Sequence, residues 1–397
     1  MGNFSISKET IEFQKNIFRE YYEKNNMKLP DRFGRREYAF VLFERKGMMR
    51  HIGFERKTNF NRYVKGNTPF HAYYSSAFYQ KPNAPTMQEK EWMGAELIFD
   101  LDSDHIVSDP EKTPYEKQLE KVKEEFIKLV NDFLINDFGF EKKYIDLYFS
   151  GGRGYHCHVK DPKIFDLDSN ERREIVDYIT GRDLKESLVF HDQATGRKQY
   201  HGRNFPSGKS LKMPLPNDPG WRGRISRGII ELINEIKNSK YPIEKLKEYG
   251  VTEKESEKLL TDLSEDRIKR IKEGKLDQSK TIRKFFLNNA LRKTAVSMSA
   301  GETDEPVTCD IKRLIRLPDS LHGKTGFRVK KIPIDKLNDF DPLLDAVVLP
   351  TESVEIKINQ NIKNKINGEE FVLEKGKNKV PIYFAIFLIG KKIANII

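Results

Sequence analysis

Cysteine is almost absent from this chain: Cys157 and Cys309 are the two among its 397 residues. Two thiols exclude a disulfide framework, and they also exclude a zinc site built from four thiolates. A chain with so few cysteines suits a reducing environment, so we expect the protein to lie inside the cell, in the cytoplasm.

Long hydrophobic runs are also missing. Hydrophobic residues make up 37% of the chain, and the apolar run at 381–390 is far shorter than the roughly 18–20 residues that a membrane helix needs. Residues 1–15 lack the apolar core of a signal peptide, so we expect no membrane association. The 26 phenylalanines and 16 tyrosines still supply enough bulk for a core, which argues against a disordered chain.

Negative charge is outweighed by positive charge. The 71 lysines and arginines exceed the 60 acidic residues, and the formal net charge is +11. A surplus of this size suits a polyanionic partner, most simply nucleic acid. The alternative is a highly charged surface of the kind found in thermophilic proteins, because net charge alone does not encode a function.

The hydrophobic pattern changes between helical and strand-like segments. Apolar residues that recur every three or four positions predict helices at 8–26 and 115–138. Short apolar or alternating runs predict strands at 38–43, 48–54, 94–102, 144–150, 155–159, 304–333 and 370–388.

The composition changes after residue 190. Residues 191–227 are rich in glycine, proline and arginine and lack periodicity, so we expect a basic loop there, followed by a charged helical segment. Aromatic residues among its cations suit single-stranded nucleic acid, although a basic loop in contact with solvent alone is the equal alternative. We therefore predict an α+β protein with a mixed-sheet core from 1–190 and 301–397 and an insertion at 191–300.

Two aspartates, Asp100 and Asp102, end the most apolar predicted strand. Side chains alternate along a strand, so both carboxylates project from one face while Leu101 packs on the other. Two carboxylates this close repel each other unless a cation lies between them, and oxygen ligands suit Mg²⁺. Taken alone, the pair could equally end a strand at a solvated edge.

Three glycines join the next two predicted strands in the segment SGGRGYH, residues 150–156. Glycine allows a backbone to approach a phosphate closely, and Arg153 offers a planar fork for phosphate oxygens. His156 and His158 share one face of the following strand. A third segment, 304–326, holds Asp304, Asp310, several basic residues and His322.

Together the three segments resemble the catalytic small subunit of archaeal and eukaryotic DNA primase. FDLDSDH is similar to that family's paired-aspartate strand, SGGRGYH to its triphosphate loop, and RLPDSLHGKTG to its basic-proline-serine-histidine element. The flanking segments MMRHIGF, PFHAYYSSAFY and KVPIYFAIFLIG extend the resemblance over nearly the whole chain. The motif sequences are most similar to those of archaeal members.

The resemblance implies two metal ions, Mg²⁺ or Mn²⁺, held by three aspartates. Asp100 and Asp102 match the first two. The third lies eighteen residues before the histidine of the last element, which corresponds to Asp304 when counted back from His322. Asp310 remains the competing candidate.

The resemblance also implies a set of residues that bind the triphosphate of the incoming nucleotide. They are Ser150, Arg153, His156, Arg316 and His322. Some relatives have a second arginine where this chain has Gly152, so the loop offers one cation fewer. Arg50 is similar to a further nucleotide-contacting arginine, with an ordinary surface arginine as the alternative.

One departure concerns zinc. Many members carry a cysteine and histidine knuckle between the aspartate pair and the glycine loop, but here that interval has His105 and no cysteine. A closed zinc site needs four ligands, so a structural zinc is doubtful on these residues. A non-standard site using His191 and His201 stays open.

The function implied by the resemblance is synthesis of short RNA primers, or also DNA primers, on a single-stranded DNA template from nucleoside triphosphates. The expected partner is the primase large subunit in a heterodimer. The alternatives are a related polymerase of repair or end joining, and a non-catalytic subunit that binds single-stranded nucleic acid.

Overall fold

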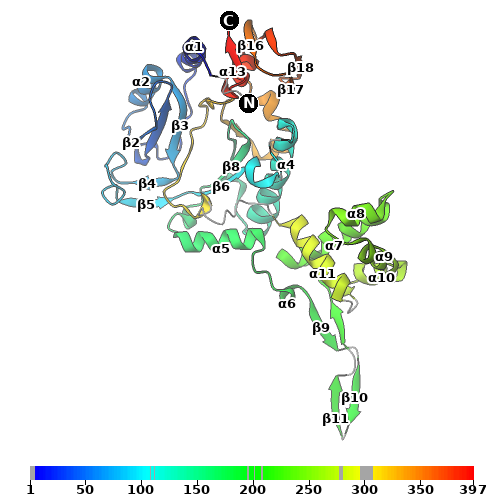
Figure 1. Ribbon diagram of the computed structural model, residues 1–397. Helices are drawn as coiled ribbons and strands as arrows, with labels where there is room; N and C mark the ends of the chain where they lie inside the picture. Colours follow the sequence, from blue (N-terminus) through cyan, green and yellow to red (C-terminus); the bar gives the residue numbers. More distant parts are fainter. Residues whose placement is uncertain are drawn as a thin grey trace. The chain divides into compact units, whose positions relative to one another are not determined.

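The computed structural model describes residues 5–107, 109–110, 112–194, 196–200, 202–206, 209–276, 280–295 and 307–397. They divide into two compact units, one of Met1–Val176 with Ser297–Ile397 and one of Asp177–Val296. Helices and antiparallel sheets both contribute to the fold (Figure 1), so the predicted α+β class is confirmed.

Two four-stranded antiparallel sheets form the centre of the first unit. In the first sheet the strand order is β14 (Leu314–Arg316), β3 (Pro69–Ser75), β1 (Tyr38–Leu42) and β2 (Met48–Ile52). In the second sheet the order is β15 (Lys330–Ile332), β7 (Ile145–Phe149), β8 (Gly154–Val159) and β6 (Leu97–Asp102). Smaller sheets join β4 (Ala77–Tyr79) to β5 (Trp92–Ala95), β17 (Ile362–Ile366) to β18 (Glu369–Leu373), and β16 (Ser353–Ile358) to both β19 (Gly376–Pro381) and β20 (Ala394–Ile396).

Helices cover these sheets. The α-helices of this unit are α1 (Lys8–Lys24), α2 (Lys57–Asn67), α3 (Ser103–Ile106), α4 (Tyr115–Lys128), α12 (Pro342–Asp345) and α13 (Ile382–Gly390), while α5 (Ser169–Thr180) runs across the division between the units in the sequence. A π-helix, Leu129–Asp137, continues α4. Short 3-10 turns lie at Phe33–Arg35, Lys142–Tyr144, Pro162–Ile164, Val307–Cys309 (η5) and Ile334–Lys336.

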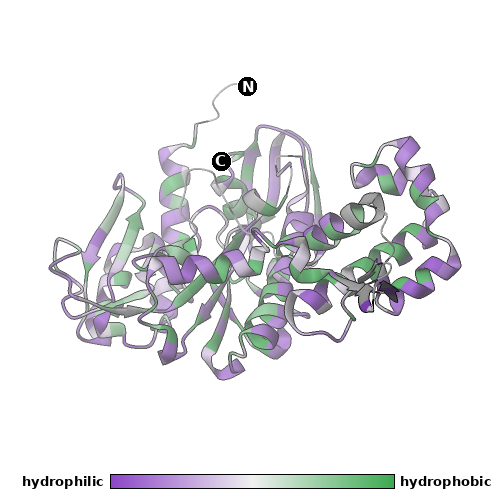
Figure 2. Cartoon of the chain, turned by 90° about the horizontal axis from the view of Figure 1, so that it is seen from below, coloured by the Kyte–Doolittle hydropathy of each residue, from purple (hydrophilic) through white to green (hydrophobic). Residues whose placement is uncertain are grey.

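The core lies where α4 packs against β6 and β8. Every residue of β8 is buried, and Leu119, Val122 and Phe126 bury the facing side of α4. Each such side chain contributes about 1.5–3 kcal/mol when it leaves water. Several helices carry both hydrophobic and hydrophilic residues (Figure 2), and the buried residues of α1 and α4 recur every three or four positions, as predicted.

The strand predictions at 94–102 and 370–388 need correction. The segment 94–102 is not one strand, because it divides at Glu96, whose buried carboxylate forms an ion pair with Arg36. Within 370–388, the end is the helix α13 rather than a strand, and Tyr383 to Ile389 are all buried. A short run that is apolar on every side carries no periodicity, so its sequence cannot distinguish a buried strand from a buried helix.

The second unit is richer in strands than predicted. Its strands are β9 (His191–Ala194), β10 (Arg197–Tyr200), β11 (Arg203–Pro206), β12 (Lys209–Lys212) and β13 (Lys275–Leu276). The basic loop predicted at 191–227 is therefore wrong over most of its length. These strands carry no alternation of apolar residues, and they form through antiparallel backbone pairing such as that of β10 with β11.

Helices make up the rest of the second unit. They are α6 (Glu186–Val189), α7 (Gly220–Asn238), α8 (Pro242–Glu248), α9 (Glu253–Asp262), α10 (Glu265–Lys272) and α11 (Lys280–Thr294). The apolar stripe of α7, with Ile225, Ile229 and Leu232 fully buried, packs against α11. At the start of α7, Arg222 forms an ion pair with Asp218. This arginine thus has a structural partner within the unit.

Across the described part of the chain, none of the helices combines the length and the apolar character that spanning a membrane requires.

Candidate active site

The pairing of β6 with β8 places the acidic pair beside the glycine loop. Asp100 lies opposite His156, and Asp102 lies opposite Gly154, the last residue of that loop. Leu101 is 1% exposed on the other face of β6, whereas the side chains of Asp100 and Asp102 are 25% and 35% exposed. The two carboxylates therefore share the accessible face of the strand, as alternation predicted.

Asp100 is held as a carboxylate by its neighbours. Its Oδ1 lies 3.4 Å from Nε2 of His156. Burial tends to raise the pKa of this carboxyl group, but the His156 imidazole and the guanidinium groups of Arg313 and Arg316 outweigh burial. The pKa of Asp100 is consequently lowered.

Asp102 has the opposite balance. Burial raises its pKa, and the negative charges of Asp100 and Asp104 raise it further. Its Oδ1 caps α3 by accepting a hydrogen bond from the Asp104 amide at 3.2 Å, and it lies 3.7 Å from the Arg153 guanidinium. These contacts do not cancel burial and repulsion, so a bound cation would relieve a real electrostatic cost at this site.

The Ser150 side chain closes the glycine loop from inside. Its Oγ accepts hydrogen bonds from the amides of Gly152 at 3.2 Å and Gly154 at 3.3 Å. Arg153 points out of the loop and forms an ion pair with Asp104. A Cβ added at Gly151, whose φ is +76°, would lie 2.8 Å from the Cβ of His322, so only glycine fits this close approach.

The close approach joins the loop to the turn that carries His322. The Thr325 hydroxyl donates to the Gly151 carbonyl, and it lies 3.1 Å from Nδ1 of His322. Because the hydroxyl proton is already used, Nδ1 of His322 is the donor to Thr325. Burial, together with the charge of Arg316, holds the pKa of His322 well below its usual value. A neutral His322 therefore presents Nε2 toward the glycine loop, 3.2 Å from the position of a Cβ on Gly152.

Arg316 lies on β14 in the first sheet, and its side chain is held by His71, a residue that the sequence did not indicate. Nδ1 of His71, on β3, accepts from Arg316 at 2.8 Å and from the Gly323 amide at 3.2 Å. Two donors on one lone pair require an unprotonated Nδ1. The pKa of His71 agrees with this requirement. It is lowered to about 3, first by burial and then by the charges of Arg316 and Lys324. His71 therefore holds both Arg316 and the His322 turn.

Arg50 and Asp310 form their contacts outside this group. Arg50 donates to the buried carboxylate of Glu37 at 3.1 Å, which is a structural partner. Asp304 lies outside the described residues. Asp310 follows η5, which packs against β6, and its Oδ1 accepts from the Lys312 amide at 2.9 Å. The segment beside β6 is thus a 3-10 turn where the sequence suggested a strand.

Comparison with known proteins identifies the family. A family model described as DNA primase small subunit matches residues 99–334. The chain is also 38% identical to the DNA primase small subunit PriS of Methanothrix thermoacetophila, over 98% of this chain and 100% of the relative. The chain belongs to the DNA primase small subunit family. The predicted resemblance, and with it the predicted primase small subunit, is confirmed.

Two further relatives are similar over comparable lengths. The DNA primase small subunit PriS of Methanosarcina acetivorans is 39% identical over 98% of this chain and 97% of its own length. That of Picrophilus torridus is 38% identical over 96% and 97%. The matched range 99–334 contains Asp100, Ser150, Arg316 and His322, but it does not contain Arg50 or the C-terminal helix α13.

The acidic face of β6 fits the divalent metal that primase chemistry implies. It offers oxygen donors, and the raised pKa of Asp102 reflects burial and like-charge repulsion that a cation would relieve. Within the described ranges, no group of three or more histidine, cysteine or acidic residues is arranged to hold a metal. Asp304, the sequence-based candidate for a third ligand, lies outside these ranges.

The alternative zinc ligands give no further support. His201 lies outside the described residues, and Nε2 of His191 lies 2.8 Å from the Arg222 guanidinium in the second unit. The described residues therefore do not test the prediction about a structural zinc.

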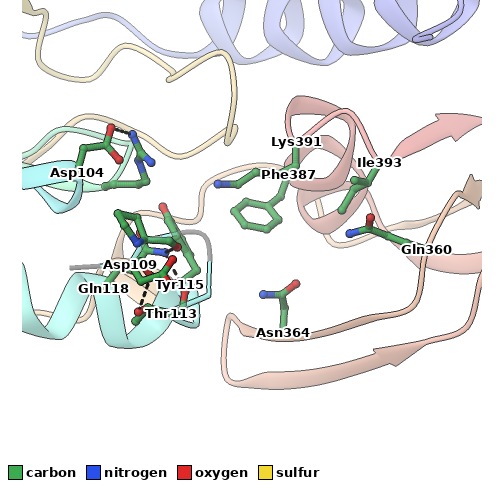
Figure 3. Close-up of a pocket in the computed structure, with 12 residues that line it drawn as sticks. Asp104, Asp109, Thr113, Tyr115, Gln118, Gln360, Asn364, Phe387, Lys391 and Ile393 are labelled. Carbon is green, nitrogen blue, oxygen red and sulfur yellow. Dashed lines mark hydrogen bonds and ion pairs between the residues drawn. The ribbon is translucent and has the colours of Figure 1, made fainter. Parts of the chain in front are cut away.

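A cavity of about 820 Å³ opens beside the glycine loop. Figure 3 shows Asp104 and Tyr115 on one side of the cavity and Phe387, Lys391 and Asn364 on the other. The Tyr115 hydroxyl donates to the Gly152 carbonyl, so the cavity wall and the loop are directly connected. Arg153 also lines the cavity.

Proposed function

We propose that this chain synthesises primers on a single-stranded DNA template as a nucleotidyltransferase. The 3′-hydroxyl of one nucleotide attacks the α-phosphate of the next, and pyrophosphate leaves. The observation that carries the proposal is the register of β6 with β8, because it sets a pair of carboxylates directly beside the glycine loop that carries Arg153. Metal binding and phosphate binding are then available within one site.

Asp100, Asp102 and Asp304 are the residues that would hold Mg²⁺ or Mn²⁺. Two such ions, when bound, activate the attacking oxygen and stabilise the charge on the leaving one. The contribution of the chain is to keep Asp100 ionised through His156 and to present both carboxylates on the same face. Ser150, in turn, keeps the loop closed and fixes the direction of its amides.

Binding of the triphosphate is assigned to Ser150, Arg153, His156, Arg316 and His322. Arg153 and Arg316 supply positive charge from two sides of the site, as charge-assisted donors. His322 is neutral in the described state, and an approaching triphosphate would favour its protonation at Nε2. Arg50 is kept as a candidate nucleotide contact, although its side chain is shared with Glu37.

The finer properties are proposed on the same basis. The substrates would be ribonucleoside triphosphates, with deoxyribonucleotides as an open alternative, which makes the enzyme a DNA-directed RNA polymerase of the primase type. The large subunit would be its partner in a heterodimer in the cytoplasm. The basic surplus suits the template, through salt-sensitive contacts with phosphates.

A primer-synthesis assay on single-stranded DNA with labelled nucleotides tests this function. The reaction is run with Mg²⁺, with Mn²⁺ and with a chelator, in the presence and absence of the large subunit. Products of defined length that require a divalent metal are expected. Metal-independent nucleic-acid binding without any product would instead identify a non-catalytic subunit.

Arg153→Ala and His322→Ala should mainly weaken nucleotide binding. A charge-assisted hydrogen bond contributes roughly 1.5–3 kcal/mol, so the KM for the nucleotide should rise about ten- to a hundredfold. Steady-state kinetics at fixed template concentration measure the change. Arg35→Ala is a suitable control, because Arg35 is an exposed arginine that contacts Gln80. An unchanged KM in both site variants would contradict the triphosphate assignment.

His71→Leu should raise the KM for the nucleotide about tenfold, because Arg316 and the Gly323 amide both lose their acceptor. His71→Asn should stay within about threefold of the wild type, since Oδ1 of asparagine can take the place of Nδ1. Thermal unfolding of both variants measures how much stability is lost when the imidazole ring is removed. A KM that rises equally in the two variants would mean that His71 acts through packing alone.

A further inference from the structure

The C-terminal helix ends against the turn that carries His322. A Cβ added at Gly390, the last residue of α13, would lie 2.1 Å from the carbonyl oxygen of Lys324. Such an approach is possible only for glycine, and it fixes the end of α13 on this turn. Lys391 follows immediately, so the backbone places its side chain beside two segments of the site, the His322 turn and the glycine loop.

The Lys391 ammonium group faces the large cavity (Figure 3). Nζ lies 4.8 Å from the centre of the Tyr115 ring and 5.4 Å from that of Phe387. Tyr115 contacts the glycine loop through its hydroxyl group, which donates to Gly152. Lys391 is therefore supported by the same residue that supports the loop.

Lys391 lies near charges of both signs. The pKa of Lys391 is lowered by burial first and then by the charges of Arg153 and Lys324, which outweigh the opposing effect of Asp104 and Asp102. Of the carboxylates that line the cavity, Asp104 is paired with Arg153 and Asp109 with Lys112. Within the described residues, no carboxylate forms an ion pair with Lys391. Its position after α13 also gives it a favourable interaction with the helix dipole.

Lys391 and Arg153 both line this cavity, and two cations placed in this way suit an anion that carries several charges. We propose that Lys391 binds the terminal phosphate of the incoming nucleoside triphosphate, in the cavity that it shares with Arg153. The inference rests on the proposed function, because it extends the triphosphate site that contains Arg153 and His322.

The test compares equilibrium binding of ATP and ADP to the full-length chain in the presence of Mg²⁺. Lys391→Met keeps most of the side-chain stem and removes the charge. It should weaken the binding of ATP about tenfold and change the binding of ADP by less than about twofold. Lys391→Arg should retain ATP binding within about threefold, because the charge remains. Lys392→Met is the matched control, since this neighbouring lysine lines a different, mainly apolar groove, and it should bind both nucleotides normally.

Arg153→Ala, measured alongside, separates the two proposals. If Arg153→Ala weakens ATP but Lys391→Met does not, the role of Lys391 is overturned and the triphosphate site stands. If Lys391→Met weakens ATP and ADP equally, the lysine does not contact the terminal phosphate, and the inference is also overturned. If neither variant affects ATP, the triphosphate assignment itself fails together with the inference.

Discussion

Asp100→Asn and Asp102→Asn should each reduce primer synthesis by on the order of a thousandfold or more, because each removes a ligand from the proposed metal site. Both side chains project from the accessible face of β6. Primer synthesis on single-stranded DNA under saturating nucleotide and metal measures the loss. Asp104→Asn is the matched control from the same motif. Its activity should stay within about tenfold of the wild type, because Asp104 forms an ion pair with Arg153 and is not a proposed metal ligand. Near-normal turnover in either of the first two variants would remove the two-metal site.

The same variants should differ in stability when metal is absent. The folded pKa of Asp100 is lowered, so its ionised form stabilises the fold above its unfolded pKa, and this contribution is lost as pH falls. Asp100→Asn should therefore unfold at a lower temperature than the wild type at pH 7. The pKa of Asp102 is raised, so its charge opposes folding, and Asp102→Asn should hold or slightly raise the unfolding temperature. Thermal unfolding at pH 7 with a chelator distinguishes the two.

Local patterns predicted the acidic face well. Alternation along one strand is enough to place Asp100 and Asp102 together, and three glycines in one short segment indicate a backbone that approaches a ligand or another segment. Both features depend on neighbours in the sequence. The structure adds that Gly151 makes its close approach to His322, which lies far along the chain.

Contacts between distant segments could not be predicted in the same way. His71 reaches Arg316 because β3 pairs with β14, two strands separated by most of the sequence. A lone histidine in a strand-like segment gives no sign of that partner. The strands β9 to β12 were missed for a different reason, since their polar sequences lack alternation and depend on backbone pairing. Tertiary pairing, rather than local propensity, decides both cases.

The identity of the third carboxylate depends on a segment that starts outside the described residues. Asp304 lies there, and it is supported by its spacing of eighteen residues from His322. The turn that follows it, η5, packs against β6. Asp310 lies after η5 and is engaged locally, because its amide donates to Val307 and its carboxylate accepts from the Lys312 amide.

Asp304→Asn should therefore be inactive, with a loss similar to that of Asp100→Asn, while Asp310→Asn should retain most of its activity. In an extended chain, six residues would separate the two carboxylates by roughly 20 Å. The two variants are matched in chemistry, since each exchanges one carboxylate for an amide in the same segment. Metal titration of primer synthesis checks the assignment further, because loss of a ligand raises the Mn²⁺ concentration needed for activity. An inactive Asp310→Asn beside an active Asp304→Asn would move the third ligand to Asp310, and the turn after η5 would then have to open toward β6 when metal binds.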